Sequence, residues 1–343
     1  MPLRTVTIDP LGDPRWQRFV ETSEQATVFH HVQWLALLHA QYGYPIYALC
    51  VVDAAGRVVA GVPLAHVRSR LTGRRLVALP FSDHCPILVQ GDRGGEALEL
   101  LAASLQRRHR EHGLAVEVRG ELPGLPVGSR SFYHHRICLS GGYEGVASGF
   151  RQNMRRDIRR AHRDGVVVEL GRGRADLDAF YDLHLRTRRR QGVPTQPRRF
   201  IRRFEQLFDS GLGFVLVARH TGVPVAAAVY LQWGSTLTYK YGASATDHLR
   251  VRPNHAVFEE SIRWSCEQGL TTLDLGRTDL DNEGLRSFKL GWGAEEQMLT
   301  YSSLAGRSLH QGGTLASLAH AVITRTPPIT GRVAGLTLYR HFG

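Results

Sequence analysis

The chain repeats one order of predicted elements, and this repeat limits the folds that it can adopt. Residues 47–67 read as two strands joined by a turn, and an amphipathic helix over 94–113 and a further strand follow them. Residues 214–233 again read as strand, turn and strand, and a helix over 254–269 and a strand come after them. We interpret this order as two copies of one α/β unit. The alternative is a chance similarity between two ordinary hairpin–helix–strand runs.

The repeat and the length of 343 residues predict two domains. We place an N-terminal domain over residues 1–130, a C-terminal domain over 131–305 and a helical tail over 306–343. The tail either packs on the protein, which we prefer, or touches a membrane surface. The first 30 residues do not resemble a signal peptide, and no run reaches the roughly 18 apolar residues of a membrane span. We therefore expect a cytoplasmic protein.

The formal net charge of +12 favours anionic partners, which are nucleic acid, phosphorylated substrates or an acidic membrane surface. Only two of the 43 basic residues, Lys240 and Lys289, are lysines. Lysine and arginine are not equivalent where a compact or titratable charge is needed, so these two positions are candidate functional residues. The four cysteines are scattered, and we expect neither a zinc site nor a disulfide framework.

The region between the two copies carries a strongly basic helix over residues 149–165. Its apolar residues follow each other at steps of four, four and three and form one face: Phe150, Met154, Ile158 and Ala161. Arginines cover the remainder, among them Arg155 and Arg159. This face indicates contact with the phosphates of tRNA or of a diphosphate-linked acceptor. The alternative is an ordinary solvated helix face.

Three segments, 155–169, 180–197 and 239–301, resemble the Fem-type branch of the GNAT-like acyltransferases, which includes the enzymes that build peptidoglycan interpeptide bridges. The resemblance implies an α/β fold with a tandem pair of GNAT-like domains, each a mixed central sheet flanked by helices. It also implies an enzyme that moves an acyl or aminoacyl group to an amine of a cell-envelope (peptidoglycan or polysaccharide) precursor by direct attack. The alternative function is non-catalytic nucleic-acid binding through the basic surface.

The resemblance also implies roles for the two lysines. Phe288-Lys289 matches a Phe-Lys pair of Fem-type proteins, and we expect the ammonium at this position to hold a donor phosphate or to stabilise the tetrahedral oxyanion, with Phe288 beside the donor. Lys240 lies on the central strand, and alternation predicts that Tyr239 and Tyr241 share one face while Lys240 points to the other. The alternatives are a solvent-facing lysine at 240 and a lysine that caps its own helix C-terminus at 289.

Acidic residues follow the strand that comes after the second helix. Asp279 and Asp281 are candidates to accept the amine proton, although such loops are also common helix N-caps. Arg277 either binds phosphate or forms an ion pair with Asp274 or Asp279. Tyr241 completes the residues that we expect to line the cleft.

The donor stays open between acyl-coenzyme A and aminoacyl-tRNA, and we expect no tightly bound cofactor. The Gly-rich loop of coenzyme A users is missing from "DHLRVRPNHA", where Arg250, Arg252 and Asn254 could hold phosphate with side chains instead. We expect His255 to be a packing residue. The expected partners are a small-molecule or lipid-linked envelope precursor, tRNA under one of the two donors, and the inner face of a membrane, but not DNA.

Overall fold

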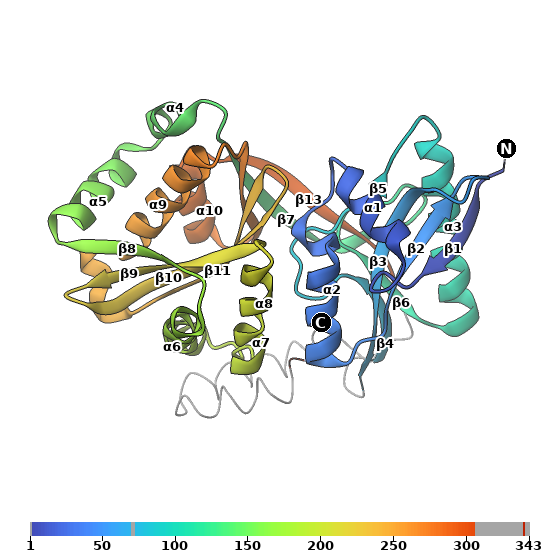
Figure 1. The fold of residues 1–343 in the computed structure, drawn as a ribbon, viewed down its shortest axis with the longest axis horizontal. Helices are drawn as coiled ribbons and strands as arrows, with labels where there is room; N and C mark the ends of the chain where they lie inside the picture. The colour runs from blue at the N-terminus through green and yellow to red at the C-terminus, as the bar shows by residue number, and fades with distance from the viewer. Residues whose placement is uncertain (1, 70–72, 306–338, 340–343) are drawn as a thin grey trace. The chain divides into compact units, whose positions relative to one another are not determined.

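The computed structural model describes residues 2–69, 73–305 and 339, and Figure 1 shows its elements. The described residues form two compact units, which divide between residues 132 and 133. Residues 298–305 return to the first unit, so that β7 (Val127–Cys138) and β13 (Glu295–Leu304) each have residues in both. The tail predicted over 306–343 lies outside the described residues apart from Tyr339. Within the described part of the chain, no helix combines the length and the apolar character that crossing a bilayer requires.

The first unit is a mixed sheet with the strand order β1-β2-β3-β4-β6, in which β4 and β6 are parallel. Its strands are β1 (Arg4–Ile8), β2 (Ile46–Val52), β3 (Val58–Ser69), β4 (Gly73–Ala78), β5 (Leu88–Val89) and β6 (Ala115–Val118). Its helices are α1 (Pro14–Thr22), the short η1 (Val28–His30), α2 (Val32–Tyr42) and α3 (Gly94–His112). Gly43 and Gly113 end α2 and α3 in the left-handed conformation that glycine adopts easily.

The second unit is a mixed sheet with the strand order β7-β12-β11-β10-β9-β8. Its further strands are β8 (Val166–Gly171), β9 (Gly213–His220), β10 (Val223–Trp233), β11 (Thr236–Ser244) and β12 (Thr272–Asp279). Its helices are α4 (Gly142–Ser148), α5 (Gln152–Arg163), α6 (Arg174–Arg190), α7 (Arg198–Arg202), α8 (Phe204–Asp209), η2 (Thr246–Val251), α9 (Pro253–Glu267) and α10 (Glu283–Gly291). Figure 1 shows α5 and α9 on one face of this sheet and α6 on the other.

The predicted repeat is confirmed by the element order of the two units. The hairpin β2–β3, the strand β4, the helix α3 and the strand β6 correspond to the hairpin β9–β10, the strand β11, the helix α9 and the strand β12. In both units the strand after the helix pairs in parallel with the strand that follows the hairpin, as β6 with β4 and β12 with β11, and the first unit has the short β5 in addition. The predicted α/β class with two mixed sheets flanked by helices is therefore correct.

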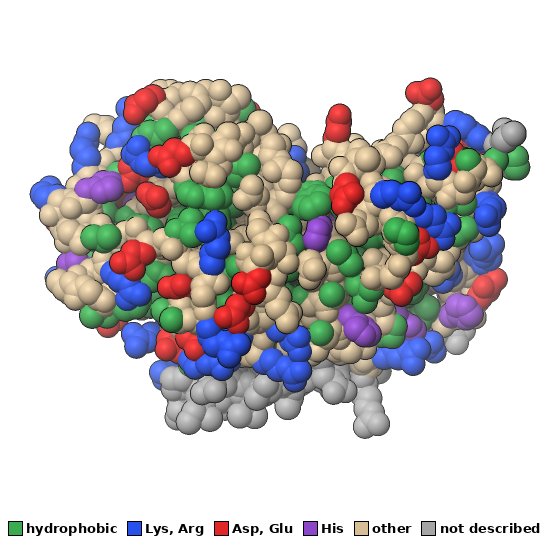
Figure 2. Space-filling model, viewed as in Figure 1, with side chains coloured by type: hydrophobic (Ala, Val, Ile, Leu, Met, Phe, Trp, Pro, Cys, Tyr) green, Lys and Arg blue, Asp and Glu red, His purple; other side chains and the backbone are tan. Residues whose placement is uncertain are grey.

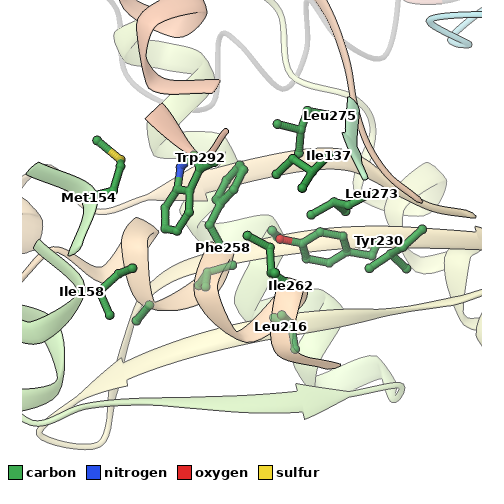
Figure 3. Packing of buried hydrophobic residues seen from close by; sticks show 14 of the residues in the cluster. Ile137, Met154, Ile158, Leu216, Tyr230, Phe258, Ile262, Leu273, Leu275 and Trp292 are labelled. Atoms are coloured by element: carbon green, nitrogen blue, oxygen red, sulfur yellow. The ribbon is translucent and has the colours of Figure 1, made fainter. Parts of the chain in front are cut away.

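The core of the second unit lies between its sheet and the helices α5, α9 and α10 (Figure 3). All four apolar residues of the predicted basic helix are buried there: Phe150, Met154, Ile158 and Ala161. Trp292 is fully buried, stacks on Phe258 at 5.5 Å and meets Phe150 edge-on at 5.0 Å between ring centroids. This aromatic cluster fixes α10 against α9, because Trp292 follows the last residue of α10 directly.

The predicted placement of the two tyrosines on one face of β11 is wrong, and a β-bulge is the reason. Val229 of β10 pairs with Tyr241, but the next residue, Tyr230, pairs with Tyr239, so Lys240 is an extra residue in the ladder. Tyr239 consequently packs on Phe258 of α9, with ring centroids 5.0 Å apart. Tyr241 lies on the opposite face, where its ring centroid is 5.7 Å from that of His184 on α6.

Replacing Trp292 with alanine should lower the free energy of unfolding by about 3–5 kcal/mol, because it removes a large buried side chain and leaves a cavity. Urea unfolding followed by circular dichroism measures this change. The matched control is Met298→Ala, at a side chain that is 58% exposed, which should change stability by less than about 0.5 kcal/mol. Equal effects of the two substitutions would contradict the role given to Trp292.

Candidate active site

The two central strands of the second unit separate part of the way along their length. β11 and β12 pair in parallel over Thr236–Thr238 and Thr272–Asp274. Within the described strands the pairing ends there, although β11 continues to Ser244 and β12 to Asp279. Beyond Thr238 and Asp274, the residues of β11 and β12 are no longer paired. Backbone N–H and C=O groups at such an edge can bind a ligand instead.

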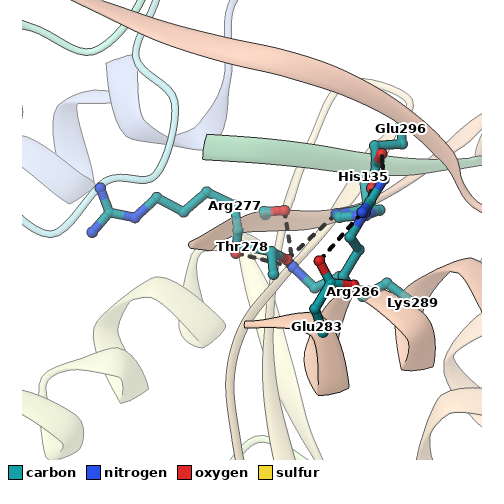
Figure 4. A network of polar contacts seen from close by, with 8 residues as sticks. His135, Arg277, Thr278, Glu283, Arg286, Lys289 and Glu296 are labelled. Carbon is teal, nitrogen blue, oxygen red and sulfur yellow. Dashed lines mark hydrogen bonds and ion pairs between the residues drawn. The ribbon is translucent and has the colours of Figure 1, made fainter. Parts of the chain in front are cut away.

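Lys289 holds the part of β12 that lies directly after the separation. Its side chain is 2% exposed, and Nζ donates to the carbonyl oxygens of Gly276 and Arg277, both at 3.0 Å (Figure 4). A buried ammonium needs such acceptors, because burial without them would be very costly. The bonds go to β12 and not to the C-terminus of α10, which differs from the helix-capping alternative for this residue.

Asp274 binds the backbone N–H of Gly276, the residue whose carbonyl oxygen Lys289 binds. Oδ1 of Asp274 accepts hydrogen bonds from the Gly276 backbone N–H at 2.7 Å and from His134 Nε2 at 2.8 Å. Burial alone would raise the pKa of Asp274, but His134, the Gly276 N–H and Arg136 together lower it to about 2. Gly276 has a positive φ of 66°, which favours glycine. A buried anion and a buried cation thus fix one turn of backbone between them.

A second polar network surrounds Lys289 on the side of β7 and β13. Arg286 of α10 forms a bidentate pair with Glu296, with both N–O distances at 2.8 Å, and Glu296 is 2.9 Å from Nε2 of His135 (Figure 4). Burial lowers the pKa of His135, the positive charge of Lys289 lowers it further, and Glu296 opposes both. Burial and Lys289 thus outweigh Glu296 and disfavour the charged form of His135.

Lys240 is the bulge residue of β11, two residues after the last residue that pairs with β12. It is 8% exposed, and its Nζ lies 4.9 Å from the ring centroid of Tyr241. This burial disagrees with the solvent-facing alternative. Both lysines are thus buried near the point where β11 and β12 separate. Lys240 is a residue of β11, and Lys289 binds the backbone of β12.

The candidate acids and Arg277 lie at the end of β12. Asp279 and Asp281 are exposed, and Asn282, not an aspartate, caps α10 by accepting the Leu285 N–H at 3.1 Å. Figure 4 shows the guanidinium of Arg277 directed away from Lys289. The backbone carbonyl oxygen of Arg277, in contrast, accepts a hydrogen bond from Lys289 Nζ. The turn that Lys289 holds therefore also sets the direction of the Arg277 side chain.

The N-terminus of α9 and the basic helix α5 meet through Asp157. Asp157 Oδ2 is 3.4 Å from Arg252 Nε and 3.6 Å from His255 Nε2. Burial lowers the pKa of His255 to about 4, with Asp157 opposing the change and Arg252 adding to it. His255 also packs edge-on against Phe288 at 5.6 Å, which fits the predicted packing role.

The predicted residues therefore fall into two groups. One group lies on β11, on β12 and the turn after it, and on α10: Lys240, Tyr241, Arg277, Asp279, Asp281 and Lys289. The other surrounds the start of α9 and the exposed face of α5: Arg155, Arg159, Arg250, Arg252 and Asn254. Phe288 connects them, because it precedes Lys289 on α10 and contacts His255 on α9. Sequence reasoning missed His134, His135 and Glu296, and the adjacent buried histidines of β7 are the signal that could have indicated them.

Comparison with known proteins defines the class. Residues 148–296 match the model of the acetyltransferase (GNAT) domain family. The crystal structure of FemX aligns with this protein at a TM-score of 0.66 and 16% sequence identity. The alignment covers 92% of this chain and 100% of the FemX chain. A tandem GNAT protein from the clavulanic acid biosynthesis pathway has a TM-score of 0.53 at 15% identity, with 88% and 98% covered. Residues 148–296 of the second unit thus match the GNAT domain family, and the chain has the fold of tandem GNAT proteins.

The curated relatives narrow the resemblance to the Fem-type branch. A UDP-N-acetylmuramoylpentapeptide-lysine N(6)-alanyltransferase from Weissella viridescens is 28% identical over 134 residues, which are 38% of this chain and 40% of the relative. A lipid II:glycine glycyltransferase from Staphylococcus haemolyticus is 33% identical over 105 residues, 28% of this chain and 25% of the relative. The alignments thus span two fifths or less of these relatives. The resemblance to Fem-type proteins that the sequence indicated is confirmed.

Replacing Lys289 with methionine should lower the free energy of unfolding by about 1–3 kcal/mol, because the buried carbonyls of Gly276 and Arg277 lose their donor. Methionine keeps most of the side-chain length, so packing changes little. Urea unfolding measures the effect, and Leu285→Met on the exposed side of α10 is the control. Unchanged stability of the Lys289 variant would show that these bonds do not hold the turn.

His255 should make the protein less stable in acid. Its folded pKa of about 4 lies below the ordinary value near 6.5, so between these values the unfolded chain takes up the proton more readily. Stability is lost as the pH falls through this window, by up to about 3 kcal/mol from this residue. His255→Asn should make the decline between pH 6.5 and 4 shallower, and His112→Asn, at an exposed site, should leave it unchanged.

Proposed function

We propose that this protein is an enzyme that transfers an acyl or aminoacyl group to an amine of a cell-envelope precursor. The observation that carries the proposal is the separation of β11 and β12 beside the buried Lys289, within the residues that match the GNAT family. The named relatives act on a UDP-linked muramoyl pentapeptide and on lipid II. A nucleotide-linked or lipid-linked peptidoglycan precursor is therefore the acceptor class that we infer, and the inner face of the membrane is its expected place of action.

The reaction needs alignment and charge stabilisation more than a reactive side chain. The acceptor amine attacks the donor carbonyl, a C–N bond forms, and the carbonyl oxygen becomes an oxyanion. The bond to the leaving oxygen or sulfur then breaks, and the amine proton passes to a base while the leaving group takes up a proton. In this proposal Lys289 stabilises the oxyanion, either directly or through the turn of β12 that it holds, and the exposed Asp279 or Asp281 accepts the amine proton.

The donor in this proposal is aminoacyl-tRNA or an acyl-coenzyme A thioester. Side chains at the start of α9 support a phosphate-bearing donor, because Arg250 is exposed and Arg252 caps the helix with a left-handed backbone. The exposed Arg155 and Arg159 on α5 extend this basic surface toward a longer polyanion. A non-catalytic nucleic-acid-binding protein would use the same arginines but would not need a buried lysine at position 289.

The test supplies charged tRNA and acyl-coenzyme A separately, together with a nucleotide-linked or a lipid-linked peptidoglycan precursor, and identifies products by mass spectrometry. Lys289→Ala should lower kcat by at least about a hundredfold with little change in KM or in RNA binding. Arg110→Gln, an exposed arginine of α3, removes one charge elsewhere and should leave turnover unchanged. Circular dichroism at the assay temperature confirms that each variant is folded.

Two results would overturn the proposal. One is the absence of any product with both donors and both precursors, while tRNA still binds with a steep dependence on salt, as a binding module would. The other is full activity of Lys289→Ala. A product with one donor only decides between thioester and tRNA.

A further inference from the structure

Tyr239 stands where β11 and β12 separate. It is the first residue of β11 after Thr238, the last one that pairs with β12. Its ring packs on Phe258 of α9, with ring centroids 5.0 Å apart, and its hydroxyl forms no hydrogen bond with any of the described residues. A tyrosine hydroxyl in an apolar cluster usually has a hydrogen-bond partner. The missing partner indicates that this hydroxyl serves a ligand.

Gly242 makes room for the Tyr239 hydroxyl. A Cβ atom at position 242 would overlap this hydroxyl, so the ring can lie along the strand only because Gly242 has no side chain. Tyr239 and Gly242 are both partly exposed, whereas Lys240 and Ala243 beside them are buried. The hydroxyl therefore lies over a stretch of strand that is open to a ligand.

The backbone of Gly242 faces the edge of β11 that is turned away from β10. The Ala245 N–H donates to the Val225 carbonyl of β10, and alternation along the antiparallel pair then directs the N–H and C=O of Ser244 and Gly242 away from β10. Both groups of Ser244 bond to the hydroxyl of Thr187, at 3.0 and 3.2 Å. Gly242 presents its groups two residues earlier, where β12 is not paired with β11. A ligand that bonds to them would lie next to the Tyr239 hydroxyl.

The Tyr239 hydroxyl is suited to donate a proton. Burial raises the pKa of Tyr239 above its ordinary value of 10.0, so the hydroxyl keeps its proton at pH 7. Figure 2 shows acidic and basic side chains interspersed over the drawn face of the second unit, where water surrounds them. Tyr239 instead offers a neutral O–H donor at a partly buried place.

We propose that Tyr239 is a further catalytic residue, whose hydroxyl gives its proton to the leaving oxygen or sulfur of the donor. This inference rests on the proposed function, in which the bond to the leaving atom breaks and an alkoxide or a thiolate departs. Proton donation in the transition state makes such a departure easier. The backbone groups of Gly242 hold the donor so that its leaving atom lies beside the hydroxyl.

The protons of this step balance. The O–H bond of Tyr239 breaks as the new O–H or S–H bond of the leaving group forms. The carboxylate of Asp279 or Asp281 has meanwhile accepted the amine proton, and water carries this proton to the tyrosinate. The enzyme therefore returns to its starting state, and no other reactant is needed.

The experiment compares Tyr239→Phe with the wild-type protein in the transfer assay with charged tRNA and with acyl-coenzyme A. The substitution removes only the hydroxyl, so kcat should fall by about a hundredfold or more, with little change in KM. The midpoint of urea unfolding should stay the same, because the hydroxyl has no partner among the described residues.

The matched control is Tyr230→Phe on β10. It also removes one hydroxyl, from a fully buried ring whose centroid is 5.7 Å from that of Tyr239, and it should leave kcat unchanged. An equal loss of activity in both variants would overturn the inference, because any change in this aromatic cluster would then slow the reaction.

A donor with a better leaving group separates proton donation from positioning. The nitrophenolate of a p-nitrophenyl ester departs without a proton, so Tyr239→Phe should use such an ester within about twofold of the wild-type rate. An equal loss with this ester and with the donor that the wild type uses would overturn proton donation by Tyr239.

The failures of the two proposals are distinguishable. Transfer by the wild-type protein together with full activity of Tyr239→Phe would overturn this inference and leave the proposed function intact. Absence of transfer by the wild-type protein with either donor would overturn both.

Discussion

The second unit depends on the place where two parallel strands stop pairing. Thr238 and Asp274 are the last paired residues of β11 and β12, and an unpaired strand end would ordinarily be loose. Here Asp274 binds the N–H of Gly276, while Lys289 binds the carbonyls of Gly276 and Arg277. Because both charged groups are buried, each bond counts for more than it would in water. The separation is consequently a fixed feature, and a substrate carbonyl could be placed against it with little reorganisation.

The helices and strands of this protein could largely be predicted from residue spacing and glycines. The helix over 94–113 ends at Gly113, where a left-handed residue is needed, and the helix over 254–269 ends next to Gly269. The prediction failed at β11, because alternation assumes a regular ladder and the bulge at Lys240 breaks it. A bulge depends on the partner strand, so the sequence of β11 alone does not reveal it.

The residues of the candidate site could likewise be predicted only where they lie close together in the sequence. Phe288-Lys289 could be found from its short motif, since both residues stand in one helix. The partners of Asp274 and Glu296 could not, because His134 is 140 residues from Asp274 and His135 is 161 residues from Glu296 in the chain. Only the strand order β13-β7-β12 brings such residues together. The Asp274–His134 pair is moreover buried, where apolar residues are the usual expectation from sequence.

The burial of both lysines has a practical consequence for chemical labelling. Lys240 is 8% exposed and Lys289 is 2% exposed, and the sequence has no other lysine. Succinimidyl esters and similar amine-selective reagents would therefore meet no accessible lysine side chain on the folded second unit. Acylation of either position would report that the unit has opened, which makes the native protein its own sensor of local unfolding.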